Sequence, residues 1–249
     1  MSDSGDRVKR HAKQLFEQIS DPWPEGDLWS SHTKRTIADF VYEFMSCNTS
    51  ITRGAHILNV GSHGNMYGIS NENHFHVDIA EKALESSALA CVGDAEQLPF
   101  ADGIFDLVLC VGSVVNYCVA ARAIGELGRV LKPGGWLLLE FETSESLEFI
   151  ATSDYGMDVT LVRTFYNGSL EHIYVYSRKY IEGALAARGL RITSLRRFHV
   201  FSPLLYRLTK RERLASIFST FDRFLHKIPF FQRHSANFLM AAYKGHDQT

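Results

Sequence analysis

The sequence predicts an α/β protein built on a doubly wound, mostly parallel sheet, and three observations support this fold class. Short apolar runs recur along the chain between helical stretches, as strands alternate with helices in such folds. These runs are continuously apolar rather than alternating, which is typical of strands buried on both faces of a parallel sheet. A chain of 249 residues with 45% hydrophobic content is also large enough for one α/β domain with a substantial core.

The first fifty residues predict helices. Within residues 29–45, Ile37, Phe40, Val41 and Phe44 recur at helical spacing. Five short apolar runs then predict strands, because they have the length of strands and are bounded by turn residues. The predicted strands are HILNV (56–60), HFHVDI (74–79), LACVGD (89–94), FDLVLCV (105–111) and WLLLEFE (136–142).

The connections between these strands differ in length. A helix is expected over Ala120 to Leu131, closed by KPGG, since Gly-Gly after a helix is a stop signal. Only about fourteen residues separate Val60 from Phe75, which is near the minimum for linking two parallel strands. We therefore expect the first crossover helix to be a stub.

Beyond Glu142 the pattern changes. Residues 159–177 predict a β-hairpin, because two β-rich arms flank Asn167-Gly168, a favoured two-residue turn. The other elements expected here are a helix (178–190), a strand (191–202), a second helix (204–228) and a last strand (237–244).

The composition excludes several kinds of protein. A formal net charge of −2 argues against a nucleic-acid partner. The four cysteines form no CxxC pair or zinc-finger cluster, so we expect reduced thiols in a cytoplasmic protein and no metal site. The N-terminus carries no apolar signal region, and the longest apolar run falls well short of the roughly 18 residues of a membrane span. We therefore expect no stable membrane insertion.

The first predicted strand ends in small residues that expose backbone. Gly61-Ser62-His63-Gly64 lies at the edge where open α/β sheets bind ligands, and small residues let a ligand approach the main chain. Alone this is a weak signal, because glycines also make ordinary turns. Asp78 and Asp94 end the next two predicted strands, where carboxylates can bind a ribose and an adenine amino group. Either Asp alone favours a helix cap or turn, but the two together favour a nucleoside site.

Two adjoining motifs carry a family resemblance. GDAEQLPFADGIFDLVLC, followed by ELGRVLKPGGWLLLE, resembles the class I S-adenosylmethionine-dependent methyltransferases, above all the small-molecule group with the ubiquinone and menaquinone C-methyltransferases. The similar segment spans residues 56–142. The resemblance implies a Rossmann-like seven-stranded sheet with an antiparallel last strand, S-adenosylmethionine (AdoMet) across the strand ends, and S-adenosylhomocysteine (AdoHcy) as product. We expect one domain over residues 1–249: a helical cover (1–50), this cofactor-binding core, and a substrate cap with C-terminal strands (143–249).

The resemblance also assigns residues to parts of the cofactor. The loop would pack against the methionine portion, Asp78 would hold the ribose, and Asp94 would recognise the adenine. The full set of expected cofactor-binding residues is Asn59, Gly61, Ser62, His63, Gly64, Tyr67, Asp78, Ile79, Asp94, Ala95, Cys110, Val111 and Gly112.

Two of these residues depart from the family pattern. The family usually has Asp or Glu where Asn59 stands and Gly where His63 stands. Asn59 cannot pair with the methionine ammonium as a charge, and His63 needs a backbone conformation that Gly adopts freely. The alternatives are weaker AdoMet binding, a closing role for Tyr67, or a relative of AdoMet as the ligand.

Candidate catalytic residues lie outside the cofactor core. His172 and His199 are candidate bases for a hydroxyl nucleophile, and Tyr117 follows the fourth strand, where this family commonly meets substrate. A lone His is more often a surface or satisfied core residue, and Tyr117 has simple packing as its alternative role. The aromatic residues in and before the hairpin are expected either to build a substrate pocket or to pack as ordinary strand residues. They are Tyr155, Phe165, Tyr166, Tyr174 and Tyr176.

The function expected is AdoMet-dependent methyl transfer to a small-molecule acceptor, at oxygen or nitrogen. The basic segment 196–233 leaves three options open: a solvated helix face, an anionic substrate, or contact with anionic lipid. Two rival functions are an AdoMet-cleaving lyase or hydrolase on the same fold and a non-catalytic AdoMet-binding module. The fold does not fix the acceptor, and the sequence says nothing about the oligomeric state.

Overall fold

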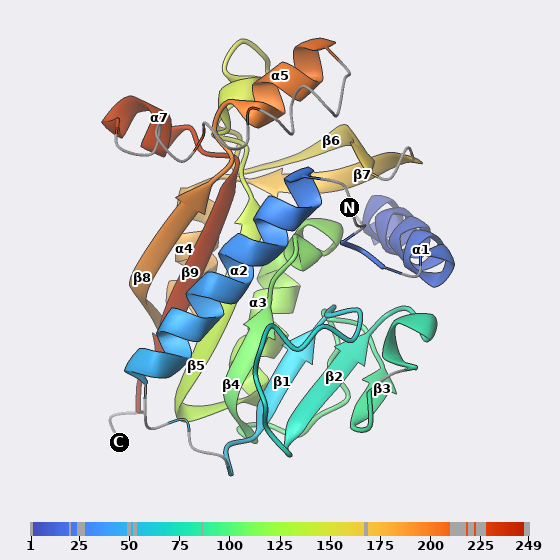
Figure 1. Cartoon of the computed structure of the whole chain (residues 1–249), viewed down its shortest axis with the longest axis vertical. Coiled ribbons are helices and arrows are strands. Elements are labelled where there is room, and N and C mark those ends of the chain that lie inside the picture. The colour runs from blue at the N-terminus through green and yellow to red at the C-terminus, as the bar shows by residue number, and fades with distance from the viewer. Residues whose placement is uncertain are drawn as a thin grey trace.

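A computed structural model describes residues 2–19, 21–23, 28–48, 51, 54–85, 87–166, 169–209, 218, 222 and 228–246. A central seven-stranded sheet has helices on both faces, and a separate two-stranded hairpin lies beyond one end of it (Figure 1). This arrangement is the predicted α/β class.

The strand order of the sheet is β3-β2-β1-β4-β5-β9-β8. Neighbouring strands among the first five pair in parallel, whereas β9 is antiparallel to both β5 and β8. The order reverses at β1, which places a topological switch point between β1 and β4. The Rossmann-like sheet with an antiparallel last strand is therefore confirmed. The strands are β1 (Ile57–Val60), β2 (His74–Asp78), β3 (Ala90–Val92), β4 (Phe105–Cys110), β5 (Leu131–Glu142), β8 (Leu190–Phe198) and β9 (Asn237–Lys244).

Helices cover both faces of this sheet (Figure 1). Alternate residues of the central strands serve two cores: Leu58 and Val108 pack with α3 and α4, whereas Ile57 and Leu107 pack with α2. Burial on both faces explains why these strands are continuously apolar. The helices are α1 (Ser2–Gln18), α2 (Leu28–Cys47), α3 (Ala120–Val130), α4 (Arg178–Ala186), α5 (Ser202–Thr209) and α7 (Pro229–Arg233), with 3₁₀ turns η1 (Lys82–Leu84), η2 (Val114–Tyr117) and η3 (Leu147–Phe149).

The connection from β1 to β2 contains no helix at all, rather than the expected stub. Gly61, His63, Gly64, Tyr67 and Gly68 all have positive φ angles, between 46° and 78°. A right-handed helix needs negative φ, so residues 61–73 form a series of turns instead.

The helix before KPGG is present and ends at Val130, one residue before the predicted end, and the motif itself belongs to β5. Leu131 pairs with Phe105 and Trp136 pairs with Leu107, so the register shifts across residues 132–135. Gly134 has a φ of +82°, a conformation that this bulge requires and that glycine adopts without strain.

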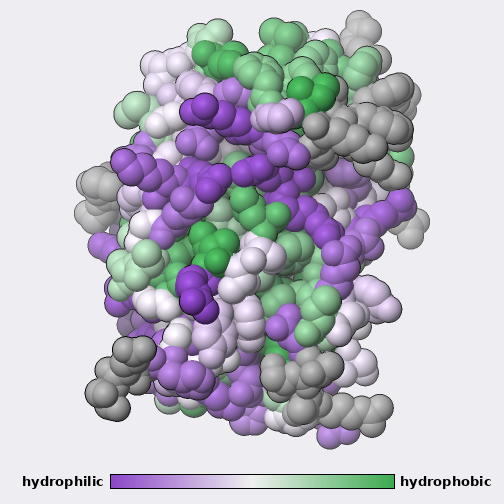
Figure 2. Space-filling model, turned by 90° about the vertical axis from the view of Figure 1, so that its left-hand side faces the viewer, coloured by the Kyte–Doolittle hydropathy of each residue, from purple (hydrophilic) through white to green (hydrophobic). Residues whose placement is uncertain are grey.

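The predicted hairpin is present as β6 (Val159–Tyr166) and β7 (Ser169–Tyr176), which pair antiparallel; its turn, Asn167-Gly168, lies outside the described residues. Most of the helix expected over 204–228 also lies outside them. At the upper end of the molecule, Leu208 and Phe230 are exposed on α5 and α7, where hydrophobic side chains gather in Figure 2. Among the described helices, none is long and apolar enough to cross a bilayer.

Candidate cofactor and acceptor site

A cavity of about 910 Å³ opens at the carboxyl ends of β1, β2 and β4. Its walls come from the loop after β1, the ends of β2, β3 and β4, helix α1, and the start of α2. The end of β5 and the hairpin close the far side. Ligands of open α/β sheets bind in this position, beside the switch point.

The cavity brings together most of the predicted cofactor residues. Ten of them line it: Gly61, Ser62, His63, Tyr67, Asp78, Ile79, Asp94, Ala95, Val111 and Gly112. The other three, Asn59, Gly64 and Cys110, are not part of the wall. Cys110 is fully buried, and burial raises the pKa of its thiol to about 12, so it stays neutral.

Gly61 begins the loop and has little space around it. Its φ is +66°, and a Cβ built there would lie 2.5 Å from Cγ2 of Val114. Its amide donates to the carbonyl of Val77 at 2.8 Å, which ties the loop to the end of β2. A glycine at this position lets η2, and the cavity wall that it carries, approach the loop closely.

The two departures from the family pattern have different roles in the structure. Asn59 is fully buried and supports the loop from below, with Nδ2 donating to the carbonyl of Asn65 at 2.7 Å. Its Oδ1 has no hydrogen-bond partner among the described residues. His63 has a φ of +48°, the left-handed conformation that a glycine would adopt without cost.

Asp78 is the best-placed residue for a ribose. Its carboxylate accepts the amides of Ala80 (Oδ1, 3.0 Å) and His63 (Oδ2, 3.0 Å), which fixes its orientation at the cavity wall. Burial raises the pKa of this carboxyl. Hydrogen bonds from bound hydroxyls would act in the opposite direction, because they favour the ionised form. The two carboxylate oxygens have about four acceptor positions between them and retain capacity beyond the neighbouring amides, so the site fits a vicinal diol.

Helix α1 covers the side of the cavity near Asp94. Lys9 donates to Asp94 at 2.8 Å and lies 3.4 Å from Glu96. One turn or more further along, Ala12 and Phe16 also line the cavity, and the Phe16 ring meets Tyr117 edge-on at 5.7 Å. The N-terminal cover is therefore held over the predicted adenine site by an ion pair and an apolar edge.

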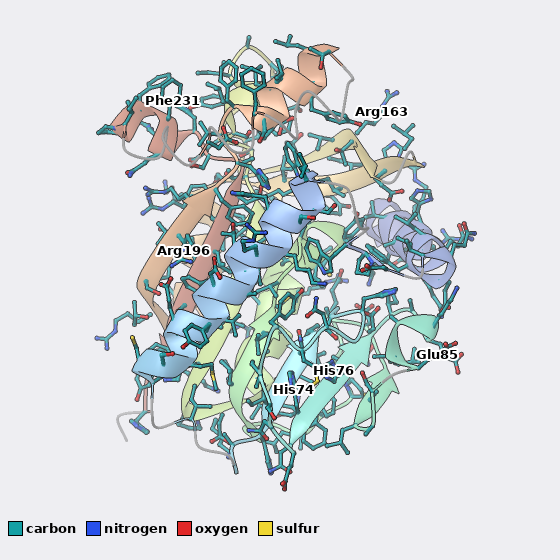
Figure 3. The ribbon with its side chains drawn as sticks, in the orientation of Figure 1. His74, His76, Glu85, Arg163, Arg196 and Phe231 are labelled. Atoms are coloured by element: carbon teal, nitrogen blue, oxygen red, sulfur yellow. The ribbon has the colours of Figure 1, made fainter. Side chains whose placement is uncertain are left out.

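A pair of buried histidines lies behind the loop on β2 (Figure 3). The rings of His74 and His76 stack at 4.5 Å, and Nδ1 of His76 is 2.8 Å from the hydroxyl of Ser62. Burial lowers the pKa of His74 to about 4, with a smaller effect from His76. Burial lowers the pKa of His76 as well, so the pair is neutral and supports the loop from the core side.

The three candidate catalytic residues are not brought together. Tyr117 lines the cavity, but His172 and His199 do not. His199 is fully buried, stacked on Trp29 at 4.1 Å, with Nε2 2.8 Å from Oγ1 of Thr33. It touches two residues of the wall without reaching the cavity, and the catalytic roles of all three stay predictions.

The hairpin reaches the cavity through Thr164 and Ile173 rather than through its described aromatic residues. Tyr176 is buried in the core, and its hydroxyl donates to the carbonyl of Cys118. Tyr174 packs against the same core, and Tyr155 contacts His234. The side chains of Phe165 and Tyr166 lie outside the described residues.

Sequence reasoning missed two glutamates at the end of β5. Glu142 lines the cavity and accepts the hydroxyl of Ser113 at 2.9 Å. Glu140 is fully buried, accepts Nδ2 of Asn237 at 2.7 Å, and also accepts the amide of Ser113. Burial raises the pKa of Glu140 to about 7 and raises that of Glu142 as well. Two carboxylates two residues apart at the end of an apolar strand, in WLLLEFE, were the available signal.

Comparison with known proteins agrees with this geometry. Residues 54–139 match the family model of a methyltransferase domain. A malonyl-[acyl-carrier protein] O-methyltransferase of Herminiimonas arsenicoxydans is 28% identical over 130 residues, covering 48% of this chain and 49% of that protein. The ubiquinone/menaquinone biosynthesis C-methyltransferase UbiE of Brucella canis is 34% identical over 94 residues, covering 37% of this chain and 33% of that protein.

A solved structure extends the similarity of fold beyond this segment. A candidate S-adenosylmethionine-dependent methyltransferase from Listeria monocytogenes superposes with a TM-score of 0.57 at 13% identity, over 84% of this chain and 98% of that one. The chain spans half or less of the curated relatives, and their names assign transfer to different atoms. Residues 54–139 are therefore a methyltransferase domain, and the chain is similar in sequence and in fold to S-adenosylmethionine-dependent methyltransferases.

Proposed function

We propose that this protein transfers the methyl group of AdoMet to a small-molecule acceptor held in the far half of the cavity. The observation that carries the proposal is the cavity itself. One part of its wall carries Asp78 and Asp94 at successive strand ends, where a nucleoside would bind, and the cavity continues beyond Gly112. That space is lined by residues of α2, β5, the hairpin and α5, which stand outside the cofactor core.

The cofactor supplies an electrophilic methyl group on a sulfonium, and the protein supplies binding, alignment and exclusion of water. Asp78 holds the ribose hydroxyls, and Asp94 with Ala95 recognises the adenine. The turn from Gly61 presents backbone to the methionine portion. Helix α1 covers the adenine end through Lys9 and keeps bulk water from the site.

The atom that receives the methyl group is, in this proposal, nitrogen or oxygen. A heteroatom acceptor that carries a proton needs a group to take it, and Glu142 offers a carboxylate at the cavity wall. Because the named relatives include both C- and O-methyltransferases, similarity does not choose among the atoms.

Product analysis tests the proposal. The purified protein is incubated with AdoMet labelled in the methyl group and with pools of neutral, cationic and anionic small molecules. The expected result is AdoHcy, formed together with a labelled acceptor, and loss of both in Asp78→Ala. Formation of methylthioadenosine without a labelled acceptor would contradict methyl transfer and support the AdoMet-cleaving alternative.

A further inference from the structure

The far half of the cavity is acidic and aromatic. Beyond Gly112 the residues that line the cavity include Glu142 and Glu148. Trp23, Trp29 and Tyr206 line the same part of the wall. Carboxylates beside aromatic faces are the chemistry that recognises organic cations.

The positive charge of the wall lies at the other end. Among the lining residues that the structure describes, Lys9 is the single Lys or Arg, and its ammonium is already paired with Asp94 and Glu96. Among the described lining residues, an anionic acceptor would therefore find no unpaired cationic side chain in the far half and would meet Glu142. Like charges at short distance in a partly desolvated site strongly disfavour binding.

The carboxylate of Glu142, a residue of the cavity wall, has unused capacity to accept hydrogen bonds. One oxygen accepts the hydroxyl of Ser113 at 2.9 Å, and the other makes no hydrogen bond among the described residues. Behind it, Glu140 lies on the same face of β5, and both carboxylates contact Ser113. Desolvation raises the pKa of both groups, that of Glu140 to about 7. A cation bound beside Glu142 would offset this desolvation by favouring the ionised carboxylate.

We infer that the acceptor is a primary or secondary amine on an apolar, aromatic-sized body, bound as its ammonium ion against Glu142. This inference rests on the proposed function and names the substrate class for the same site. Glu142 is the catalytic residue in it, and Glu140 with Ser113 positions that carboxylate.

The proton step balances on the groups named. An N–H bond of the ammonium breaks, an O–H bond forms on Glu142, and the nitrogen keeps the electron pair. The neutral amine can then form its N–C bond as the methyl group leaves sulfur with the positive charge passing to nitrogen. The sulfur retains the electron pair of the broken C–S bond as a thioether, and Glu142 returns its proton to water when the product leaves.

Three matched probes test the inference by calorimetry on protein saturated with AdoHcy. They are 2-phenylethylamine, 2-phenylethanol and 3-phenylpropionate, which share a ring and differ in the charge of the terminal group. We expect the amine to bind at least ten-fold more tightly than the alcohol and the carboxylate not to bind. Equal binding of the amine and the carboxylate, or no binding of the amine at millimolar concentration, would overturn the inference.

Variants assign the preference to one side chain. Glu142→Gln should lower the ratio of amine affinity to alcohol affinity at least ten-fold. Glu142→Asp, which keeps the charge, should lower this ratio less. Glu85→Gln makes the same charge change at an exposed site outside the cavity wall (Figure 3) and should leave the preference unchanged. A preference that survives Glu142→Gln contradicts the inference. Saturation with AdoHcy distinguishes failure of this inference from failure of the proposed function. A protein that does not bind AdoHcy contradicts the proposed function itself, whereas a protein that binds AdoHcy but not the amine contradicts only the inference.

Discussion

The turn at Gly61 gives a prediction whose size follows from the structure. Replacing Gly61 by Ala places a Cβ 2.5 Å from Cγ2 of Val114 at a φ of +66°. The left-handed conformation costs a non-glycine residue about 1–2 kcal/mol, and overpacking of this kind costs about 1–3 kcal/mol more. We therefore expect Gly61→Ala to lower the free energy of unfolding by about 3 kcal/mol.

Two other glycines separate these contributions. Gly156 has nearly the same φ, +71°, with no atom within 4 Å of a built Cβ, so Gly156→Ala should cost only the conformational part. Gly183 lies inside α4 with equally open space and an ordinary φ, so Gly183→Ala should stabilise the protein by about 0.5–1 kcal/mol. The measurement is urea denaturation followed by circular dichroism, with AdoHcy titration of each folded variant.

A second substitution tests the clash directly. Val114→Ala removes both methyl groups that a Cβ at Gly61 would meet, so the two substitutions together should cost less than the sum of their separate effects, by about 1–3 kcal/mol. The reasoning is refuted if Gly61→Ala is no more destabilising than Gly156→Ala, or if the two effects simply add.

Other predictions concern the histidine pair, the end of the fold and the cover. Because burial lowers the pKa of His74 from 6.5 to about 4, the unfolded state binds a proton that the native state does not between these values. The free energy of unfolding is therefore unaffected by His74 above pH 6.5 and falls by about 3 kcal/mol as the pH is lowered to 4. Urea titrations at several pH values should show a smaller loss in His74→Phe. Asp222 is buried and accepts hydrogen bonds from the amide of Phe201 at 2.8 Å and the hydroxyl of Ser202 at 2.7 Å. Asp222→Ala should therefore lower the free energy of unfolding by about 2–4 kcal/mol, and an unchanged melting temperature would contradict this. Lys9→Ala removes the ion pair to the cavity wall and should speed AdoHcy dissociation several-fold in stopped-flow measurements, with little loss of stability; an unchanged rate would argue against a covering role for α1.

The fold, and the strand ends at which the predicted cofactor residues meet, followed largely from local sequence. Asp78 and Asp94 end short apolar runs that predicted strands, and parallel strands bring their carboxyl ends to one edge, although β3, before Asp94, is largely exposed. The absence of a first crossover helix was only half foreseen, because the positive φ angles of His63 and Tyr67 are set by their surroundings rather than by residue type.

The half of the cavity that we propose for the acceptor depends on contacts between distant parts of the chain. Trp29 stacks on His199 across 170 residues of sequence, and no local pattern predicts such a pair. His199, a candidate base from outside the cofactor core, contacts the wall residues Trp29 and Thr33 but does not itself line the cavity. Glu142 was visible in the sequence, yet its meaning came only when the structure placed Ser113 beside it.

The most direct test of the account is calorimetric titration of the protein and of Asp78→Asn with AdoHcy. Asn keeps the shape of the side chain but removes the charge that would accept the ribose hydroxyls. Charge-assisted hydrogen bonds contribute about 1.5–3 kcal/mol each, so their loss should weaken binding by at least about ten-fold. We predict one site of micromolar affinity in the natural protein and that weakening in the folded variant. A folded protein that binds no AdoHcy, or an Asp78→Asn variant that binds it equally well, would contradict the assignment of this cavity to the cofactor.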